Sequence, residues 1–252
     1  MKFILSSIIC VICLPVSYSQ SMTITVNGIH FNMIYIKGGT FRMGSVDWDS
    51  FKDESPVHEV SLSPYLIGQT EVTQELWETV MGTNPSKRLN PKHPVDCVSW
   101  NDCQIFIQKL NLLTGQLFRL PTEAEWEFAA RGGLTGHKYS GSNVVGNVAY
   151  MGDNSASTAH NVAHRKPNDY GIYDMSGNVW EWCHDWYAKN YNDRKEINPT
   201  GPEKGNEHVV RGGSWNCIAR VCRVSNRFKC PPDGYRDDLG LRLVLDVKKR
   251  NL

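Results

Sequence analysis

The chain lacks an excess of charge of either sign, because its 27 Lys and Arg residues are balanced by 26 Asp and Glu residues. It also lacks long runs of like charge, so we do not expect nucleic acid as a partner. Internal repeats, low-complexity linkers and breaks in composition are missing as well. With 252 residues, 40% of them apolar, the chain is long enough for a sizeable core, and we expect a single domain over residues 20–252.

A long hydrophobic run is found only at the start of the chain. Lys2 precedes the apolar stretch Phe3–Leu14, and the small residues Ser17 and Ser19 follow it. This order predicts a secretory signal peptide over residues 1–19. The run has about 12 residues where a bilayer needs ~20, so we expect no membrane insertion after cleavage. The protein is therefore expected to be exported, as a periplasmic, cell-surface or secreted protein.

Six of the eight cysteines lie in the predicted mature region. An oxidising compartment makes disulfides possible, but six cysteines allow many pairings and the sequence does not choose among them. A chain of this length can also fold without disulfides, so free or partly paired thiols are equally open. The six residues are Cys97, Cys103, Cys183, Cys217, Cys222 and Cys230.

Two helices have the clearest sequence signals. The first is expected to begin after Ser99 and to continue at helical spacing up to Gly115. The second begins after Thr122, which forms a capping box with Glu125, and should end at Gly132. Short strands are expected earlier, over residues 29–36, 40–44, 57–61 and 65–72.

Residues 134–216 show little sustained periodicity and hold many Gly, Asn, Asp and Trp residues. In a compact domain, an irregular segment of this length must be stabilised by interactions other than the hydrogen bonds of helices and sheets. Buried tryptophans and bound calcium are the candidates. Tryptophans beside turn glycines are more often core pillars than a ligand platform. The residues concerned are Trp100, Trp126, Trp180, Trp182 and Trp215.

Seven short segments follow one another along the mature chain: Gly38–Gly44, Glu71–Thr73, Pro94–Trp100, Arg119–Glu127, Tyr170–Trp182, Arg211–Trp215 and Leu239–Arg242. In this order they resemble the formylglycine-generating enzyme (sulfatase-modifying factor) family over essentially the whole mature chain. The resemblance implies an α+β fold, namely a variant of the C-type lectin fold with little regular secondary structure.

Cys217 and Cys222 lie five residues apart after a double-glycine turn. Two thiols at this spacing can form a redox pair, share a soft metal ion or form a disulfide. Enzymes of the family oxidise a sulfatase cysteine with O₂ through two copper(I)-binding cysteines at these positions, after a Gly-Gly-Ser turn. The resemblance thus implies Cys217, Cys222 and Ser214 as catalytic residues, copper(I) as cofactor, and a cysteine-bearing protein or peptide as substrate. Thiolates are suitable soft ligands for copper(I).

The segment after Cys222 departs from the family's enzymes. It reads Arg223-Val224-Ser225-Asn226-Arg227 and lacks their serine-rich stretch. It resembles a bacterial branch in which many members have no established enzymatic role. In the alternative interpretation Cys222 is a core residue, Cys217 is incidental, and the protein is a non-catalytic C-type-lectin-like ligand-binding protein or adhesin. Residues 216–239 would then form the binding surface, as in retroelement-diversified receptors, and both interpretations stay open.

A possible calcium site lies in the segment that follows Tyr173. In the family this segment binds a structural calcium through two side chains and two backbone carbonyls, which here correspond to Asp174, Gly177, Val179 and Glu181. Calcium prefers six to eight oxygen ligands, and such a loop can supply them. The alternative is that both carboxylates only accept hydrogen bonds from loop N–H groups.

Other metal motifs are weak or absent in the sequence. Asn147 and Val148 are weak candidates for the family's second calcium site. His160 and His164 lie four residues apart, but Arg165 and Lys166 follow them. The His-x3-His-x-Glu iron motif of ergothioneine-type sulfoxide synthases is therefore absent, and we expect ordinary loop histidines.

Overall fold

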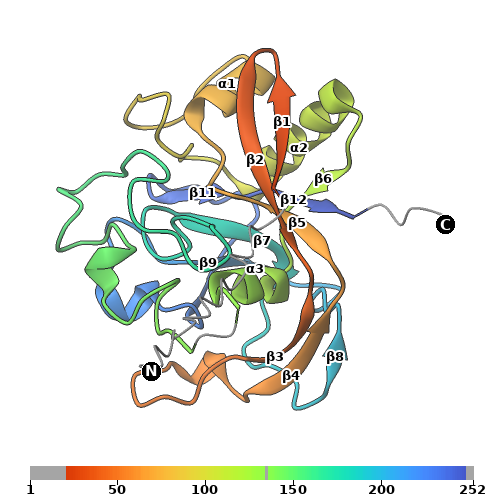
Figure 1. Ribbon diagram of the computed structural model, residues 1–252, viewed down its shortest axis with the longest axis vertical. Helices are drawn as coiled ribbons and strands as arrows, with labels where there is room; N and C mark the ends of the chain where they lie inside the picture. Colours follow the sequence, from red (N-terminus) through yellow and green to blue (C-terminus); the bar gives the residue numbers. More distant parts are fainter. Residues whose placement is uncertain (1–20, 134–135, 248–252) are drawn as a thin grey trace, which may run out of the picture.

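The computed structural model of the protein describes residues 21–133 and 136–247. Its largest sheet has the strand order β1-β2-β5-β12-β6. These strands are β1 (Ser21–Val26), β2 (Ile29–Ile36), β5 (Tyr65–Gly68), β6 (Phe118–Arg119) and β12 (Val244–Asp246). Strand β12 pairs antiparallel with both β5 and β6, so the two ends of the described chain meet in one sheet (Figure 1). The predicted signal peptide, residues 1–19, lies outside the described residues.

Two smaller sheets complete the fold. The four-stranded sheet, in the order β10-β9-β7-β11, contains β7 (Trp180–Trp186), β9 (His208–Arg211), β10 (Arg227–Cys230) and β11 (Leu239–Leu241). The three-stranded sheet contains β3 (Gly39–Met43), β4 (His58–Leu62) and β8 (Glu196–Ile197). In Figure 1 the four-stranded sheet lies in the middle of the molecule, between the β1–β2 hairpin and the three-stranded sheet.

Both predicted helices are confirmed. Helix α2 (Trp100–Thr114) begins after Ser99, whose hydroxyl accepts from the N–H of Asp102, and it ends at Gly115 in the left-handed conformation. Helix α3 (Glu123–Ala130) begins with the predicted capping box of Thr122 and Glu125. Among the helices of the described residues, none is long and apolar enough to cross a bilayer.

Helix α1 (Gln74–Met81) was not predicted from the sequence. Thr73 caps its start by accepting from the N–H of Leu76, and Gly82 ends it with a φ of 81°. A Thr and a Gly that flank an eight-residue segment are ordinary start and stop signals. Thr73 follows directly after residues 65–72, whose composition predicts a strand.

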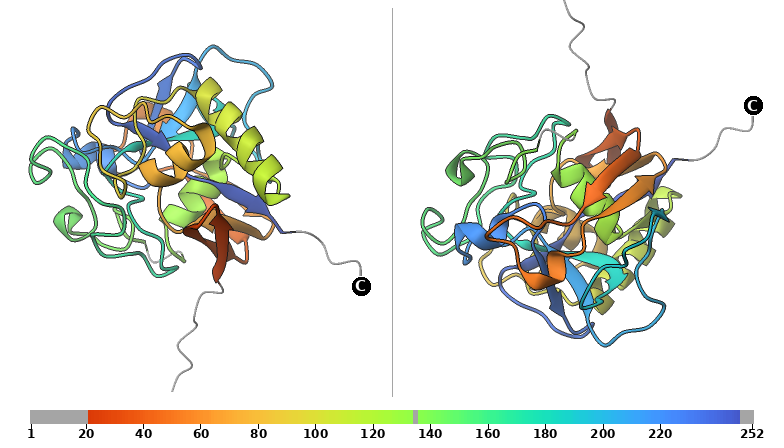
Figure 2. Two further views of the ribbon diagram at one scale, coloured as in Figure 1. Left: turned by 90° about the horizontal axis from the view of Figure 1, so that it is seen from above. Right: turned by 90° about the horizontal axis from the view of Figure 1, so that it is seen from below.

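The expectation of irregular chain over residues 134–216 is only partly right. Between residues 136 and 179 the regular structure is limited to the 3₁₀ turn η2 (Val145–Asn147), and this part of the chain gathers on the side opposite α2 (Figure 2). Strands β7, β8 and β9 lie in the remainder of the segment. Strand β7 is central and buried over most of its length, and such strands lack the polar–apolar alternation by which exposed strands are recognised.

Tryptophans act as pillars of the core, as expected. Trp126, Trp180 and Trp182 are buried. The indole N–H of Trp182 donates to the Val98 carbonyl at 3.0 Å, and that of Trp126 donates to Glu181 at 2.7 Å. These contacts satisfy the indole N–H groups of Trp126 and Trp182. Trp100 and Trp215 are only half-buried.

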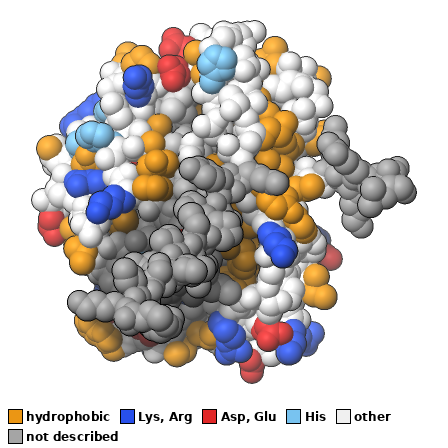
Figure 3. All heavy atoms as spheres, viewed as in Figure 1, with side chains coloured by type: hydrophobic (Ala, Val, Ile, Leu, Met, Phe, Trp, Pro, Cys, Tyr) orange, Lys and Arg blue, Asp and Glu red, His pale blue; other side chains and the backbone are white. Residues whose placement is uncertain are grey.

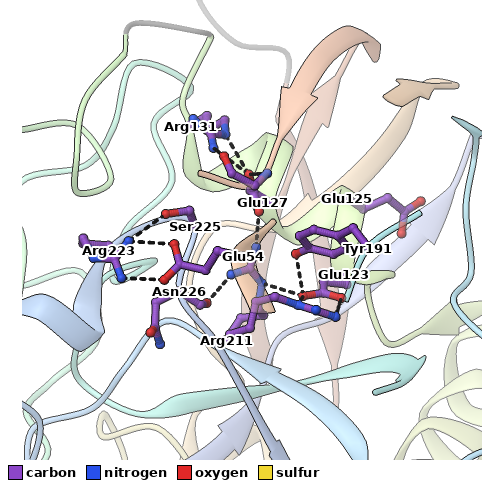
Figure 4. Close-up of polar contacts among 12 residues, drawn as sticks. Glu54, Glu123, Glu125, Glu127, Arg131, Tyr191, Arg211, Arg223, Ser225 and Asn226 are labelled. Atoms are coloured by element: carbon purple, nitrogen blue, oxygen red, sulfur yellow. Dashed lines mark hydrogen bonds and ion pairs between the residues drawn. The ribbon is translucent and has the colours of Figure 1, made fainter. Parts of the chain in front are cut away.

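The core also contains buried arginines, each paired with a glutamate that is distant in the sequence. Figure 4 shows several of these pairs around helix α3. Bidentate bonds of 2.5 and 2.7 Å join Arg223 to Glu54, which belongs to the 3₁₀ turn η1 (Lys52–Glu54). The other pairs are Arg211–Glu127, Arg227–Glu123 and Arg242–Glu181. On the face shown in Figure 3, in contrast, charged side chains of both signs are scattered.

We expect Glu54→Ala to destabilise the protein strongly, because it leaves the buried Arg223 guanidinium without its carboxylate. Loss of one member of such a pair costs about 3–5 kcal/mol. The matched control is Glu59→Ala, since Glu59 pairs with Lys195, whose side chain is 82% exposed, and exposed pairs contribute little. Denaturant unfolding measures both values. Equal losses of stability in the two variants would contradict the role assigned to the buried pair.

Candidate active site

A glycine turn brings Cys222 close to the backbone before Cys217. Gly212 and Gly213 have φ values of 100° and 74°. Residues other than glycine rarely adopt such values. A Cβ atom on Gly213 would lie 2.8 Å from the sulfur of Cys222. Cys222 itself ends the 3₁₀ turn η3 (Ala219–Cys222). The double glycine is therefore required for the packing of this thiol against the turn.

Cys217 is half-buried and lies at the end of a chain of polar contacts. Its sulfur is 3.3 Å from the hydroxyl oxygen of Ser214. That hydroxyl donates to Asp238 at 2.7 Å, and Asp238 is paired with Arg236. Burial raises the pKa of the Cys217 thiol, and the hydrogen bond with Ser214 lowers it. The position of Cys217 is thus fixed, and its thiol is held mostly protonated.

Cys222 is fully buried behind Cys217. It belongs to a small apolar cluster with Tyr139, Val148 and Met151, and Cys217 packs against this cluster. Burial raises the pKa of the Cys222 thiol well above its usual range, and the neighbouring Cys217 raises it further. Both cysteines are free thiols, as are the four other cysteines of the described residues. The structure therefore brings all three predicted catalytic residues together.

A pocket of about 480 Å³ opens over Cys217. Four aromatic residues, Phe51, Trp180, Tyr187 and Phe228, line it together with Cys217. Cys217 is reachable through this pocket, whereas Cys222 is not among the residues that line it. A molecule that enters the pocket would therefore contact Cys217 and not Cys222.

Comparison with known proteins identifies the fold. The family model of the sulfatase-modifying factor enzyme 1-like domain matches residues 25–247. The chain belongs to this family. It is 31% identical to the formylglycine-generating enzyme of Thermomonospora curvata, over 85% of this chain and 93% of that protein. It is 30% identical to the enzyme of the same name from Streptomyces coelicolor, over 85% of this chain and 89% of that protein.

Solved structures agree with this assignment. Treponema denticola variable protein 1 is 36% identical, with a TM-score of 0.84 over 90% of this chain and 99% of that one. PvdO from Pseudomonas aeruginosa is 26% identical, with a TM-score of 0.76 over 86% and 94% of the two chains. The predicted α+β fold, the sulfatase-modifying factor variant of the C-type lectin fold, is confirmed.

The predicted calcium residues lie in a buried, acidic part of this fold. Asp174 is buried, and its carboxylate accepts from the N–H of Ala163 at 2.7 Å. Glu181 is bonded to Arg242 and Trp126. The described residues contain no group of three or more His, Cys, Asp or Glu side chains arranged to hold a metal. A calcium ion would thus depend on the backbone carbonyls of Gly177 and Val179 as well.

Glu71 is a buried carboxylate that the sequence reasoning missed in this region. Its Oε1 accepts from the side-chain amide of Asn178, but its Oε2 has no hydrogen-bond partner among the described residues. Burial and the charge of Asp174 raise the pKa of Glu71, and burial raises the pKa of Asp174 to about 6. Three carboxylates, counting Glu181, surround the single Arg242 guanidinium. The raised pKa values show that burial disfavours ionisation of Glu71 and Asp174 in this cluster.

The remaining candidates have structural contacts of their own. Asn147 and Val148 belong to η2 and to the turn that follows, and Val148 packs in the cluster of Cys222. His160 stacks on Tyr150 at 3.7 Å, and His164 accepts from or donates to the Tyr150 hydroxyl at 2.7 Å. Both histidines therefore contact Tyr150 and support the irregular chain between residues 136 and 179.

Asp238 and Phe51 are further site residues that the sequence reasoning missed. Asp238 directly precedes the segment Leu239–Arg242, which was recognised, so the signal lay one residue outside the motif. Phe51 lies in a loop far from the cysteines in the sequence, and no local pattern marks it. Only the folded structure places Phe51 at the pocket of Cys217.

We expect Cys217 to be alkylated before Cys222 in the folded protein, because Cys217 is half-buried and Cys222 is fully buried. Ser214→Ala should slow the alkylation of Cys217 near neutral pH, because loss of the hydroxyl raises the thiol pKa further. Mass spectrometry of digested samples over a pH series measures both rates. Ser61→Ala, on strand β4, is the control, and preferential labelling of Cys222 would contradict the geometry.

Proposed function

We propose that the protein oxidises the cysteine of a protein or peptide substrate to formylglycine with O₂. The observation that carries this proposal is the placement of Cys217 at the pocket and against the apolar cluster that contains Cys222. About 30% identity to two formylglycine-generating enzymes over most of the chain supports it. The signal peptide predicted over residues 1–19 leads us to propose that the protein acts after export.

The residues present fit copper(I) as the cofactor. Cys217 and Cys222 would hold it as soft sulfur ligands, and the thioether of Met151 adds a further soft atom to their cluster. When bound, copper(I) would supply the one-electron chemistry that O₂ requires. Both thiols have raised pKa values, so metal binding must displace their protons.

The polar chain beside Cys217 has a positioning role in this proposal. Ser214 holds the Cys217 sulfur at hydrogen-bond distance, and Asp238 fixes the orientation of the Ser214 hydroxyl. The Ser214 hydroxyl can turn to the sulfur when Cys217 loses its proton. Cys217 lines the pocket and packs against the apolar cluster of Cys222, so we expect a substrate cysteine to approach Cys217 from the pocket.

Reduced protein should bind a single copper(I) ion and consume O₂ in the presence of a cysteine-bearing sulfatase peptide. Cys217→Ala and Cys222→Ala should each abolish tight copper binding and turnover, because one thiolate alone is a weak site. Cys97→Ala, which removes a half-buried thiol elsewhere, is the control. Copper titration with a competing chelator and an oxygen electrode provide the two measurements. Turnover that survives in either variant of the pair would refute the proposed site.

We also propose a structural calcium held by Asp174 and Glu181 with the carbonyls of Gly177 and Val179, next to Glu71. The support is the excess of buried carboxylates in this loop. A calcium ion would neutralise the negative charge of these carboxylates and stabilise the irregular chain around them. The Arg242–Glu181 pair would then be one part of a larger buried network of charges.

Chelation should lower the melting temperature, and Asp174→Ala should remove most of that response. At a hundredfold excess over Kd, calcium is expected to add ~3 kcal/mol. The response should be larger near about pH 7.5 than near about pH 5, because Asp174 has a raised pKa of about 6 and only the ionised carboxylate binds the cation. Without calcium, the stabilisation from protonated Asp174 is lost as the pH rises through about 6. An unchanged melting curve in chelator would overturn the proposal.

A second candidate function is ligand binding without catalysis. It is favoured by exposed apolar side chains within residues 216–239, where Ile218 is 64% exposed and Tyr235 is 69% exposed. The likeness to Treponema denticola variable protein 1 also agrees with it. In this case the protein would bind an extracellular ligand or act as an adhesin, and it would consume no O₂ with any cysteine peptide.

A further inference from the structure

A second pocket, of about 420 Å³, lies between the three-stranded sheet, helix α3 and the end of β7. Met43 on β3, His58 on β4 and Glu196 on β8 line it, and these three strands lie below α3 in Figure 1. Neither cysteine of the candidate active site is among its lining residues. This second pocket is therefore a separate place at which a ligand can bind.

Asp185, on β7, is a buried carboxyl group at this pocket. It is 4% exposed. Its Oδ2 accepts from the backbone N–H of Glu123 at 2.9 Å, and its Oδ1 accepts no hydrogen bond from the residues that the structure describes. Arg227, the basic residue that lines the pocket, binds Glu123 instead. Burial and the charges of Glu123 and Glu125 raise the pKa of Asp185 well above its usual range, although Arg227 lowers it. Asp185 thus lacks a counter-ion of its own.

Glu196 adds a second carboxylate without a permanently charged partner. Its Oε2 lies 3.6 Å from Nε2 of His58, and an imidazole is charged only when it is protonated. Nδ1 of His58 lies 3.2 Å from the Pro56 carbonyl, whereas Nε2 is buried and has no hydrogen-bond partner within residues 21–133 and 136–247. Negative charge at this pocket therefore exceeds positive charge, which favours a cation and disfavours an anion.

The wall opposite these polar groups is apolar and closely packed. Gly201 has a φ of 73°, and a Cβ atom there would lie 2.8 Å from the Cβ of Asp185. Pro199 and Pro202 flank this position and line the pocket together with Trp186. The Trp186 ring stacks on the ring of His208 at 3.8 Å, so its orientation is fixed. A preformed wall of this kind costs little conformational entropy when a ligand binds.

We propose that this pocket binds a small organic cation, namely a primary amine with a short apolar body. The ammonium group would take the place of the proton on Asp185, donate to its free Oδ1 and face Glu196. The apolar body would pack on Trp186 and the two prolines. The pocket has the volume of an ordinary small-molecule site. The proposal goes beyond the oxidase function, since it concerns another pocket and needs neither copper nor O₂.

Three probes with nearly the same body separate the effect of charge from that of size: benzylamine, benzyl alcohol and benzoate. Isothermal titration calorimetry measures their affinities. Benzylamine should bind about tenfold more tightly than benzyl alcohol, because a hydrogen bond between charged groups is stronger than one between neutral groups. Benzoate should bind more weakly than both. The preference for the amine should grow as the pH rises, as long as the amine stays charged, because Asp185 must lose its proton. Equal affinity for amine and alcohol would overturn the proposal.

Variants locate the amine in this pocket. Asp185→Asn keeps the size of the side chain and removes its charge, so it should weaken benzylamine binding about tenfold. Asp246→Asn is the matched control, since the Asp246 side chain is 65% exposed and does not line this pocket. Thr200→Trp, at an exposed residue of the pocket rim, should block entry and tests the site even if Asp185→Asn does not fold. Melting curves show which variants are folded.

One more variant separates this pocket from the one over Cys217. Phe228→Ala removes an aromatic ring from the pocket over Cys217 and should leave the affinity for benzylamine unchanged. Affinity that is lost in Phe228→Ala would place the amine in that other pocket. Full affinity in Thr200→Trp and in folded Asp185→Asn would place it elsewhere on the molecule. Either result would refute the proposal, as would the absence of benzylamine binding at millimolar concentrations.

Discussion

The structure depends on the neutralisation of four buried arginines by glutamates from distant parts of the chain. A buried guanidinium without its carboxylate would be strongly destabilising, so each pair fixes the distance between two segments. The arginines also bind backbone carbonyls of irregular segments, as Arg242 does at Tyr173 and Arg211 does at Asn226. The buried ion pairs thereby stabilise irregular segments of the chain that lie outside the sheets. The pairs are Arg211–Glu127, Arg223–Glu54, Arg227–Glu123 and Arg242–Glu181.

The same pairs determine the shape of the candidate active site. Arg223 directly follows Cys222, and its partner Glu54 lies in the loop that carries Phe51. Arg227 begins β10, which carries Phe228, and its guanidinium lies 4.0 Å from the ring of Tyr191. The thiols and the pocket wall are therefore positioned by one network. A substitution in this network would change the pocket even without touching a cysteine.

Local features could be predicted from the sequence, and contacts between distant segments could not. Capping boxes at Ser99 and Thr122 act within four residues, and both predicted helices are confirmed. The glycine turn and the cysteine pair could be predicted for the same reason, because Gly212, Gly213, Cys217 and Cys222 lie close together in the sequence. Glu71, in contrast, meets Asp174 only after the chain has folded, and nothing next to it in the sequence marks it as part of an acidic cluster.

Burial of the thiol pair has a chemical consequence for either function. Cys222 is sealed by apolar side chains, and both thiols have raised pKa values, so neither is a ready nucleophile or an easily oxidised thiolate. A purely structural cysteine would need no polar partner. Cys217 nevertheless has Ser214 at its sulfur, and Asp238 and Arg236 hold that hydroxyl in place. This ordered chain beside the half-buried thiol would stabilise a thiolate once a soft cation displaces the proton, and this property favours a chemical role for Cys217 over an incidental one.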